Sequence, residues 1–340
     1  MIPPEIALVP PFDLRLFPMR IVLCYPLQQR HLDQIHSAAP DAEIVNAGQE
    51  RIAEEILTAD VFCGHPKVPT PWEEVCRRNR LKWIQSSAAG LDHLLLPCVV
   101  ESPIVVTNIS GVLGNQVSEQ AMALLLGLIR SLPTFFRAQQ AKEYIRRPVR
   151  DLHGSTVGIV GLGGVGRRVA EVLSAFKTKI LATDLFPVDK PPHVKQLWAA
   201  DRLDELLPLV DILMLCVPLT DGTRGMIDAR RLGLMRKGSI LINVARGPVV
   251  VEKALVEALE SGHLWGAGVD VAATEPLPTE SRLWELPNVI ITPHVGGESA
   301  LRADQITNFF SENLRRYLAS QPLLNLVDKR LGFPVRRAGA

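Results

Sequence analysis

The sequence has few features that would tie it to a nucleic acid or a membrane. Its 37 basic and 36 acidic residues nearly cancel, and no basic stripe is interleaved with aromatic residues, so a nucleic-acid partner is not expected. The longest apolar stretch, 121–129, is too short to span a bilayer, so no membrane association is expected. The first 19 residues contain five prolines, lack the basic-then-apolar layout of a signal peptide and predict an irregular extension.

The chain is also poor in patterns that bind metals or form disulfides. It has five cysteines, an odd number, and no pair has C-x-x-C spacing, which predicts reduced thiols in a cytoplasmic protein. None of the eight histidines pairs with a cysteine or another histidine at a zinc-site spacing, so we expect no metal.

What the chain does have is enough apolar sequence for two domains. It is 340 residues long and 47% hydrophobic. In the N-terminal third, short apolar runs alternate with helical patterns, which predicts a small parallel sheet with helices on both faces. The expected strands are 21–24, 43–45, 61–64, 82–85 and 104–107, and the expected helices are 31–38, 51–57 and 72–79.

The stretch from Thr156 to Asp184 carries the strongest pattern. An apolar strand is followed by a G-x-G-x-x-G turn at 161–166, a helical pattern, a second strand and a terminal acid. Although a lone glycine turn is weak evidence, all these parts in order predict a dinucleotide-binding Rossmann unit. The predicted cofactor ligands here are Gly161, Gly163, Gly164, Val165, Gly166 and Asp184.

Asp184 bears on which dinucleotide would bind. A carboxylate at this position accepts hydrogen bonds from the ribose hydroxyls of NAD and repels the 2′-phosphate of NADP. The next three residues, Leu185, Phe186 and Pro187, include no arginine. The sequence therefore favours NAD.

Other segments leave more than one interpretation open. Small residues at 86–90 follow a strand and could present backbone N–H groups to a carboxylate, or form an ordinary tight loop. The helix expected at 115–129 is apolar nearly all round, which indicates burial between domains or in a subunit contact. Residues 134–153, which carry several arginines, are expected to run irregularly over a surface or over another subunit.

Beyond the Rossmann unit the β and α patterns continue to the end of the chain. Asp201 is the expected N-cap of a helix at 202–209, and the tail from Lys329 is expected to be flexible. The other expected elements are strands at 212–217, 239–244, 266–271 and 289–292, and helices at 250–261 and 300–319.

Three polar residues follow predicted strands and suit a carbonyl reduction. Arg246, Glu275 and His294 each lie just beyond a strand, at the edge that faces the ligand in open α/β sheets. A histidine can protonate the carbonyl oxygen, a carboxylate can fix the histidine tautomer, and an arginine can bind a substrate carboxylate. Position alone leaves open that each is an ordinary surface or core residue.

At these residues the chain resembles the D-isomer-specific 2-hydroxyacid dehydrogenase family, including its glyoxylate/hydroxypyruvate reductases and phosphoglycerate dehydrogenases. The resemblance is specific over 111–297 and looser before it. It is carried by GLGGVG at 161–166, CVPLTDGTRGMID at 216–228, MRKGSILINVARGPVVVEKALVEAL at 235–259, GAGVDVAATEPLP at 266–278, NVIITPHVGG at 288–297 and AAGLDHL at 88–94.

The resemblance implies a role for each matching residue. Arg246 would bind the substrate carboxylate and carbonyl, and His294, partnered by Glu275, would be the general acid in reduction and the base in oxidation. Asp270 would hold the nicotinamide carboxamide. Further cofactor contacts are implied at Val217, Pro218 and Gly296, and substrate-carboxylate contacts at Ala88, Ala89 and Gly90.

The resemblance also implies an architecture of two doubly wound parallel-sheet α/β domains. A Rossmann cofactor domain at 111–297 would be inserted into a flavodoxin-like substrate domain formed by 1–110 and 298–340, with substrate in the cleft between them and a homodimer formed through the cofactor domain. Glu275 disfavours formate and Ala89 disfavours phosphite as substrate, which leaves small 2-oxo acids. The alternative is a dinucleotide-sensing interaction protein similar to the family's corepressors, with little turnover.

Overall fold

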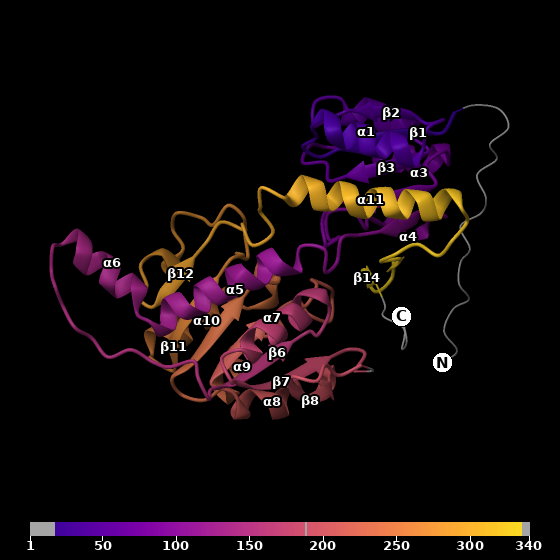
Figure 1. Cartoon of the computed structure of the whole chain (residues 1–340). Coiled ribbons are helices and arrows are strands. Elements are labelled where there is room, and N and C mark those ends of the chain that lie inside the picture. The colour runs from indigo at the N-terminus through magenta and orange to yellow at the C-terminus, as the bar shows by residue number, and fades with distance from the viewer. Residues whose placement is uncertain (1–17, 188, 335–340) are drawn as a thin grey trace. The chain divides into compact units, whose positions relative to one another are not determined.

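The computed structural model describes residues 18–187 and 189–334, which form two compact units (Figure 1). Unit 1 contains the described residues up to Val112 and those from Ser299 onward, and unit 2 runs from Leu113 to Glu298. Residues 1–17, which include most of the extension predicted from the prolines, lie outside the described residues.

Unit 1 is built on a five-stranded parallel sheet. Its spatial order is β2-β1-β3-β4-β5, the flavodoxin-like order, and confirms the predicted fold of this part. Because both faces are covered, strands such as β3 and β4 are buried along their whole length. The strands are β1 (Arg20–Cys24), β2 (Glu43–Asn46), β3 (Val61–Gly64), β4 (Trp83–Ser86) and β5 (Val105–Thr107).

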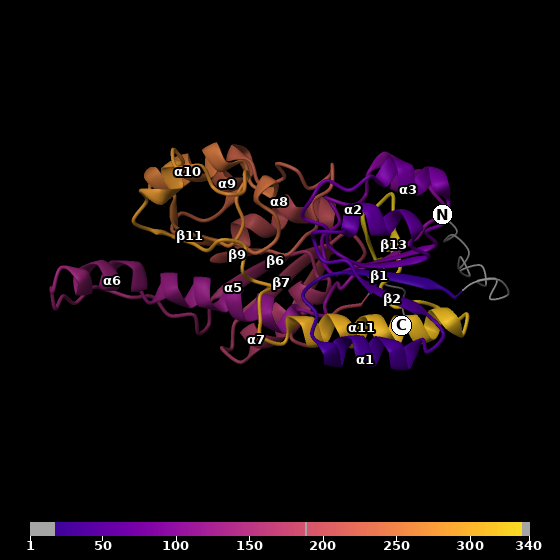
Figure 2. The same ribbon diagram turned by 90° about the horizontal axis from the view of Figure 1, so that it is seen from above.

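The C-terminal helix α11 (Arg302–Leu318) belongs to the core of unit 1. It lies alongside α1 (Gln29–Ala38), as both ribbon views show (Figures 1 and 2). The Tyr317 ring stacks on Trp83 of β4 at 5.1 Å, and Asn313 donates to the Gln85 side chain at 3.0 Å. The remaining helices of this unit are α2 (Ile52–Glu55), the 3₁₀ turn η1 (Ile56–Thr58), α3 (Trp72–Arg78) and α4 (Pro97–Glu101).

The prediction of a flexible tail from Lys329 is wrong for the described residues. The chain forms a small antiparallel ribbon of β13 (Val327–Asp328) and β14 (Phe333–Pro334). The Lys329 ammonium donates to the carbonyl oxygens of Val99, at 3.0 Å, and Ser102. These carbonyls lie at the end of α4, where backbone acceptors lack helical partners, so the lysine fixes the tail there.

Unit 2 is built on a seven-stranded parallel sheet. Its order is β12-β11-β10-β9-β6-β7-β8, so the strand order reverses at β6, as in a Rossmann fold. This confirms the predicted fold class. The strands are β6 (Thr156–Val160), β7 (Lys179–Asp184), β8 (Val194–Ala199), β9 (Ile212–Leu215), β10 (Ser239–Asn243), β11 (Leu264–Val269) and β12 (Val289–Ile291).

The apolar helix α5 (Gly114–Ile129) buries most of its apolar side chains within unit 2, where it packs on β11, β12 and α7 (Gly164–Ser174). Glycines make the close approach possible: a Cβ at Gly268 would lie 2.8 Å from the Leu124 Cβ, and one at Gly127 would lie 2.9 Å from the Ile290 Cδ1.

In the described part of the chain, no single helix is long and apolar enough to cross a membrane. Only the bent pair α5 and α6 (Leu132–Gln140), at 68°, reaches the required length and composition together.

The helices of unit 2 correct two predictions. Residues 134–153 are not all irregular, because α6 (Leu132–Gln140), which has Pro133 in its first turn, extends into this range. Asp201 is not an N-cap; it lies within a 3₁₀ turn, η2 (Ala200–Arg202), that leads into α8 (Leu203–Leu206). Strand β8, which has mixed polarity on the sheet edge, was not predicted. The other elements are α7 (Gly164–Ser174), η3 (Leu207–Leu209), α9 (Ala229–Leu234), η4 (Gly247–Val249), α10 (Glu252–Glu260) and η5 (Arg282–Trp284).

Candidate active site

The glycine turn joins β6 to the N-terminus of α7 at the point where the strand order reverses. A Cβ at Gly166 would lie 2.0 Å from the Gly161 carbonyl oxygen, so only glycine lets the helix begin against the turn. Gly161 itself has a φ of 91°, in the left-handed region. A Cβ at Gly163 would meet no heavy atom within 4 Å, so this part of the turn is open to a ligand. Free N–H groups at the start of α7, around Gly164 and Val165, suit a pyrophosphate.

Asp184 ends β7 beside this turn. Its Oδ2 accepts from the Leu162 N–H at 2.6 Å, and its Oδ1 accepts from the Phe186 N–H at 2.9 Å. The carboxylate is therefore oriented by backbone at the end of the second strand, where the Rossmann pattern places the ribose ligand.

Val217 and Pro218 follow β9, the strand on the other side of β6. The Thr223 hydroxyl donates to the Pro218 carbonyl at 2.7 Å and accepts from the Thr220 N–H at 2.8 Å. This closed turn holds the segment after β9 at the same sheet edge as the glycine turn.

Asp270 is a buried carboxylate, 3% exposed, that follows β11 and organises the segment after β12. Its Oδ1 accepts from the Thr292 hydroxyl at 2.6 Å and the Val295 N–H at 3.0 Å, and its Oδ2 accepts from the Gly296 N–H at 2.8 Å. A Cβ at Gly296 would lie 2.8 Å from that oxygen. Asp270 therefore fixes the turn on which His294 stands.

His294 and Glu275 form a hydrogen-bonded pair. His294 Nδ1 lies 2.8 Å from Glu275 Oε2, and both side chains are about half exposed. Glu275 Oε1 also accepts from the Ala272 N–H at 3.1 Å, and the His294 N–H donates to the Asp270 carbonyl at 2.7 Å. Since Nδ1 faces the carboxylate, Nε2 is the ring nitrogen left to exchange a proton with a ligand.

Arg246 follows β10 and is half-buried in the same group of loops. Its Nη1 donates to the Ala245 carbonyl at 2.8 Å, and its own carbonyl accepts from the Asn243 side chain at 3.1 Å. A Cβ at Gly247 would lie 1.9 Å from the Ala272 carbonyl atoms, so the arginine loop is in contact with the loop that bears Glu275. Since β10, β11 and β12 are neighbours in one sheet, the structure brings all three predicted polar residues to one edge.

In unit 1, the small-residue loop after β4 only partly meets the expectation of three available N–H groups. The Ala88 N–H donates to the Ser86 hydroxyl at 3.1 Å, and the Ala89 carbonyl accepts from Asn108 at 2.6 Å. Among the described residues, no group accepts from the N–H of Ala89 or Gly90. These two can bind a carboxylate, whereas that of Ala88 is engaged within the loop.

Sequence reasoning missed a cluster beside this loop. His65 follows β3, and its ring stacks on His93 with centroids 3.8 Å apart. Arg302, at the start of α11, donates to the Ser87 carbonyl at 3.3 Å. His65 could have been found because it follows a strand just as His294 does, but nothing in the sequence places His93 against it.

The environment of His65 predicts a stability that depends on pH. Burial, followed by the charges of His93, Lys67 and Arg302, lowers the pKa of His65 to about 4 from the usual 6.5. Between these values the unfolded chain binds a proton that the folded chain does not, so the free energy of unfolding falls as pH decreases. Because the imidazole is partly exposed, we expect this contribution not to exceed about 2 kcal/mol.

We expect His65→Gln to flatten this dependence when urea unfolding is compared at about pH 7 and about pH 5. The exposed His36→Gln variant in the same unit is the control and should keep the wild-type slope. Equal slopes for His65→Gln and wild-type protein would contradict the lowered pKa.

The five cysteines are free thiols, with Cys24 and Cys63 buried. Burial raises the pKa of Cys24 to about 11 and that of Cys216 to about 12, so both remain protonated at neutral pH. Within the residues that the structure describes, no group of three or more histidine, cysteine or acidic side chains is placed to hold a metal ion.

Comparison with known proteins agrees with this arrangement. Residues 122–296 match the family model of the D-isomer specific 2-hydroxyacid dehydrogenase NAD-binding domain. The chain is 34% identical over 301 residues to a glyoxylate reductase from Pyrococcus furiosus, covering 86% of this chain and 88% of the relative. It is 28% identical to a D-3-phosphoglycerate dehydrogenase from Methanocaldococcus jannaschii, covering 91% of this chain but spanning only 59% of the length of that relative.

A solved structure is similar over nearly the whole chain. It is a D-isomer specific 2-hydroxyacid dehydrogenase from Xanthobacter autotrophicus Py2 in complex with NADPH and MES, with a TM-score of 0.79 and 29% sequence identity. The similarity covers 93% of this chain and 100% of that one. The Rossmann order of unit 2, the residues at its carboxyl edge and these matches together show that the chain belongs to the D-isomer-specific 2-hydroxyacid dehydrogenase family.

Proposed function

We propose that the protein is an NAD(H)-dependent D-2-hydroxyacid dehydrogenase that interconverts a small 2-oxo acid and its D-2-hydroxy acid. The observation that carries the proposal is the 2.8 Å contact between His294 Nδ1 and Glu275 Oε2 at the carboxyl edge of a Rossmann sheet. It supplies an oriented proton donor and acceptor where the cofactor of such sheets binds.

His294 would exchange the proton of the substrate oxygen through Nε2. When the ring is protonated, both nitrogens carry hydrogen, so Nε2 can donate while Nδ1 stays bonded to Glu275. When it is neutral, Glu275 favours the tautomer with hydrogen on Nδ1 and leaves Nε2 as the acceptor. The same pair can therefore serve reduction as acid and oxidation as base.

Arg246 would bind the substrate carboxylate and polarise its carbonyl, because a guanidinium presents a planar fork of donors to carboxylate oxygens. In unit 1, the N–H groups of Ala89 and Gly90 are proposed to bind a substrate carboxylate, and unit 1 would thus be the substrate domain. Unit 2 would be the cofactor domain. When bound, the nicotinamide supplies or accepts the hydride at substrate C2.

The residues of unit 2 fit a nicotinamide dinucleotide. The open turn at Gly163 and the N-terminus of α7 suit the pyrophosphate, and the Asp184 carboxylate suits an unphosphorylated ribose. Val217, Pro218, Asp270 and Gly296 would complete the site. Although the similar Xanthobacter structure holds NADPH, the acid that ends β7 leads us to propose NAD for this chain.

The substrate is proposed to be a small 2-oxo acid such as glyoxylate or hydroxypyruvate, in line with the glyoxylate reductase relative. The test is oxidation of NADH and of NADPH by the protein with glyoxylate, hydroxypyruvate, phosphohydroxypyruvate, pyruvate and branched 2-oxo acids. We expect turnover with NADH on at least one small acid. Tight NADH binding without turnover on any acid would contradict the proposal.

The free thiols suit a reducing compartment, and we propose a cytoplasmic location.

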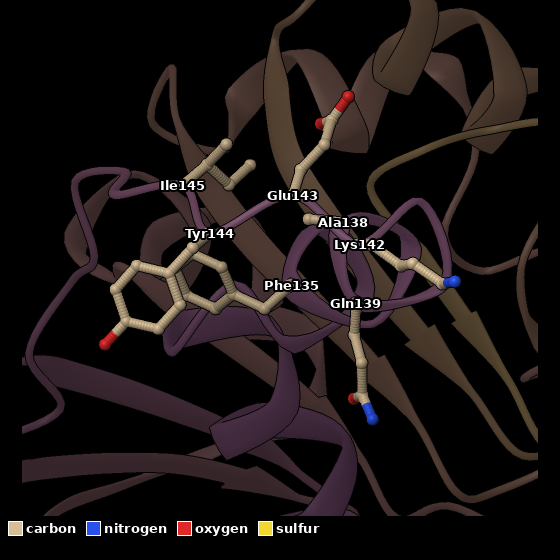
Figure 3. Close-up of a pocket in the computed structure, with 7 residues that line it drawn as sticks. All are labelled: Phe135, Ala138, Gln139, Lys142, Glu143, Tyr144 and Ile145. Carbon is tan, nitrogen blue, oxygen red and sulfur yellow. The ribbon is translucent and has the colours of Figure 1, made fainter.

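We also propose a homodimer in which α6 and the segment after it contact a second copy. In both ribbon views α6 extends beyond the sheet of unit 2 (Figures 1 and 2). Aromatic side chains are exposed on α6 and on the segment after it: Phe136 of α6 is 58% exposed, and Tyr144 beyond α6 is 98% exposed. Tyr144 also lines a hollow of about 420 Å³, whose lining residues Figure 3 shows: Phe135, Ala138, Gln139, Lys142, Glu143, Tyr144 and Ile145. Burial of such side chains against a second copy would remove apolar surface from water.

We expect the Phe136→Ser/Tyr144→Ser variant to shift the protein from dimer to monomer, because it removes two exposed apolar side chains from this surface. Light scattering after size-exclusion chromatography measures the mass directly. Leu209→Ser, which changes an exposed leucine elsewhere on unit 2, is the control and should stay dimeric. A wild-type protein that is monomeric, or a double variant that remains dimeric, would contradict this surface assignment.

A further inference from the structure

A second charged pair lies beside the glycine turn. Arg167 is the residue after Gly166 in the first turns of α7. Its Nε donates to the Leu162 carbonyl at 3.0 Å, its Nη1 to Asp189 Oδ2 at 3.0 Å and its Nη2 to the Asp189 carbonyl at 2.5 Å. The guanidinium therefore bridges the glycine turn and the segment after β7.

This guanidinium is close to Asp184, the proposed ribose ligand, because both bind the same residue of the turn. The Leu162 N–H donates to Asp184 and the Leu162 carbonyl accepts from Arg167. The Arg167 side chain is 19% exposed, whereas Asp189 is 65% exposed. A cation held by a solvent-exposed acid thus binds the same turn residue, Leu162, as the carboxylate that is proposed to bind the ribose.

We propose that the ion pair between Arg167 and Asp189 is a second determinant of cofactor choice, through which Asp189 keeps the guanidinium from binding a 2′-phosphate. The inference rests on the proposed function, since it takes the ribose to bind at Asp184. An arginine fork matches phosphate geometry, and the 2′-phosphate is what distinguishes NADP(H) from NAD(H). While Asp189 accepts hydrogen bonds from the Arg167 guanidinium and compensates its positive charge, a 2′-phosphate gains little binding energy from that guanidinium.

The two acids act on the 2′-phosphate in different ways. Asp184 repels the phosphate directly, whereas Asp189 withholds a cation that would attract it. Removing the Asp189 charge should therefore strengthen NADPH binding even with Asp184 in place. NADH has no 2′-phosphate, so its affinity should change little.

The experiment is fluorescence or calorimetric titration of the full-length protein with NADPH and NADH. We expect Asp189→Asn to lower the Kd for NADPH about tenfold, or about 1.4 kcal/mol, and to leave the Kd for NADH within about twofold. Adding Arg167→Gln to Asp189→Asn should abolish the gain, because the gain acts through the guanidinium.

Glu171→Gln is the matched control. It removes one acid from α7, the helix that carries Arg167, and breaks the Arg168–Glu171 ion pair of 2.8 Å. The net charge of the protein therefore changes as in Asp189→Asn, but at a different arginine. We expect no change in NADPH affinity. An equal gain in this control, an unchanged Kd for NADPH in Asp189→Asn, or a gain that persists without Arg167 would overturn the inference. Wild-type protein that prefers NADPH would contradict the proposed NAD preference instead, and the response to Asp189→Asn would still decide the role of the ion pair.

Discussion

We expect the His294→Gln variant to reduce 2-oxo acids with a kcat about 10²–10⁴-fold below that of wild-type protein. The loss corresponds to about 3–5 kcal/mol of barrier and follows from removing the group that exchanges the proton of the substrate oxygen. Glutamine keeps polarity and approximate size but cannot act as an acid near neutral pH. Since the histidine side chain is 43% exposed, the substitution should leave the fold intact.

Two measurements on this variant and two further variants separate catalysis from general damage. The Kd for NADH and the thermal midpoint should match those of wild-type protein. His153→Gln, at an exposed histidine of the same unit, should keep its kcat within about twofold. Glu275→Gln should cause a smaller loss than His294→Gln and alter the pH profile, because Glu275 acts through the ring. A His294→Gln protein with nearly normal kcat would contradict the proposed role.

Replacing Arg246 with glutamine should lower kcat/KM by about 10²–10³-fold, since it removes charge-assisted hydrogen bonds worth about 3–4 kcal/mol to the substrate carboxylate and carbonyl. Arg246→Lys should recover part of the loss, because it restores the charge without the planar fork. Steady-state kinetics with the best 2-oxo acid of the panel measures both variants.

Measuring NADH affinity distinguishes a loss of substrate binding at Arg246 from general damage to unit 2. Arg246→Gln should bind NADH as wild-type protein does. Arg230→Gln, which breaks an exposed ion pair between Arg230 of α9 and Asp204 of α8, should leave kcat/KM unchanged. If Arg246→Gln keeps the wild-type KM and kcat, Arg246 does not bind substrate.

Much of the molecule could be predicted because its parallel strands obey one rule. A parallel sheet buries both faces, so β6 and β10 read as continuous apolar runs, and polar residues needed for ligands follow their carboxyl ends. That rule brought Arg246, Glu275 and His294 to one edge in the prediction, and the structure brings them there. Gly166 was predictable because a Cβ there has no space beside the Gly161 carbonyl.

What the sequence could not predict depends on contacts between distant segments. The Asp270 carboxylate holds the turn of Thr292 and Gly296, more than 20 positions away, a distance for which sequence periodicity gives no signal. The Lys329 ammonium looked like part of a charged tail because its acceptors lie on α4, far back in the chain. Strand β8 is an edge strand whose polar residues face outward, so it lacks the apolar run that marks its neighbours.

The most direct test of the central proposal is the reduction of hydroxypyruvate with NADH that carries deuterium at C4 of the nicotinamide, at the position from which the hydride is transferred. The position of the deuterium in the product is then determined. We predict that deuterium is found at C2 of the product and that chiral chromatography identifies the product as the D-2-hydroxy acid. A product of L configuration, a product without deuterium at C2, or no product with any 2-oxo acid of the panel would contradict a D-2-hydroxyacid dehydrogenase.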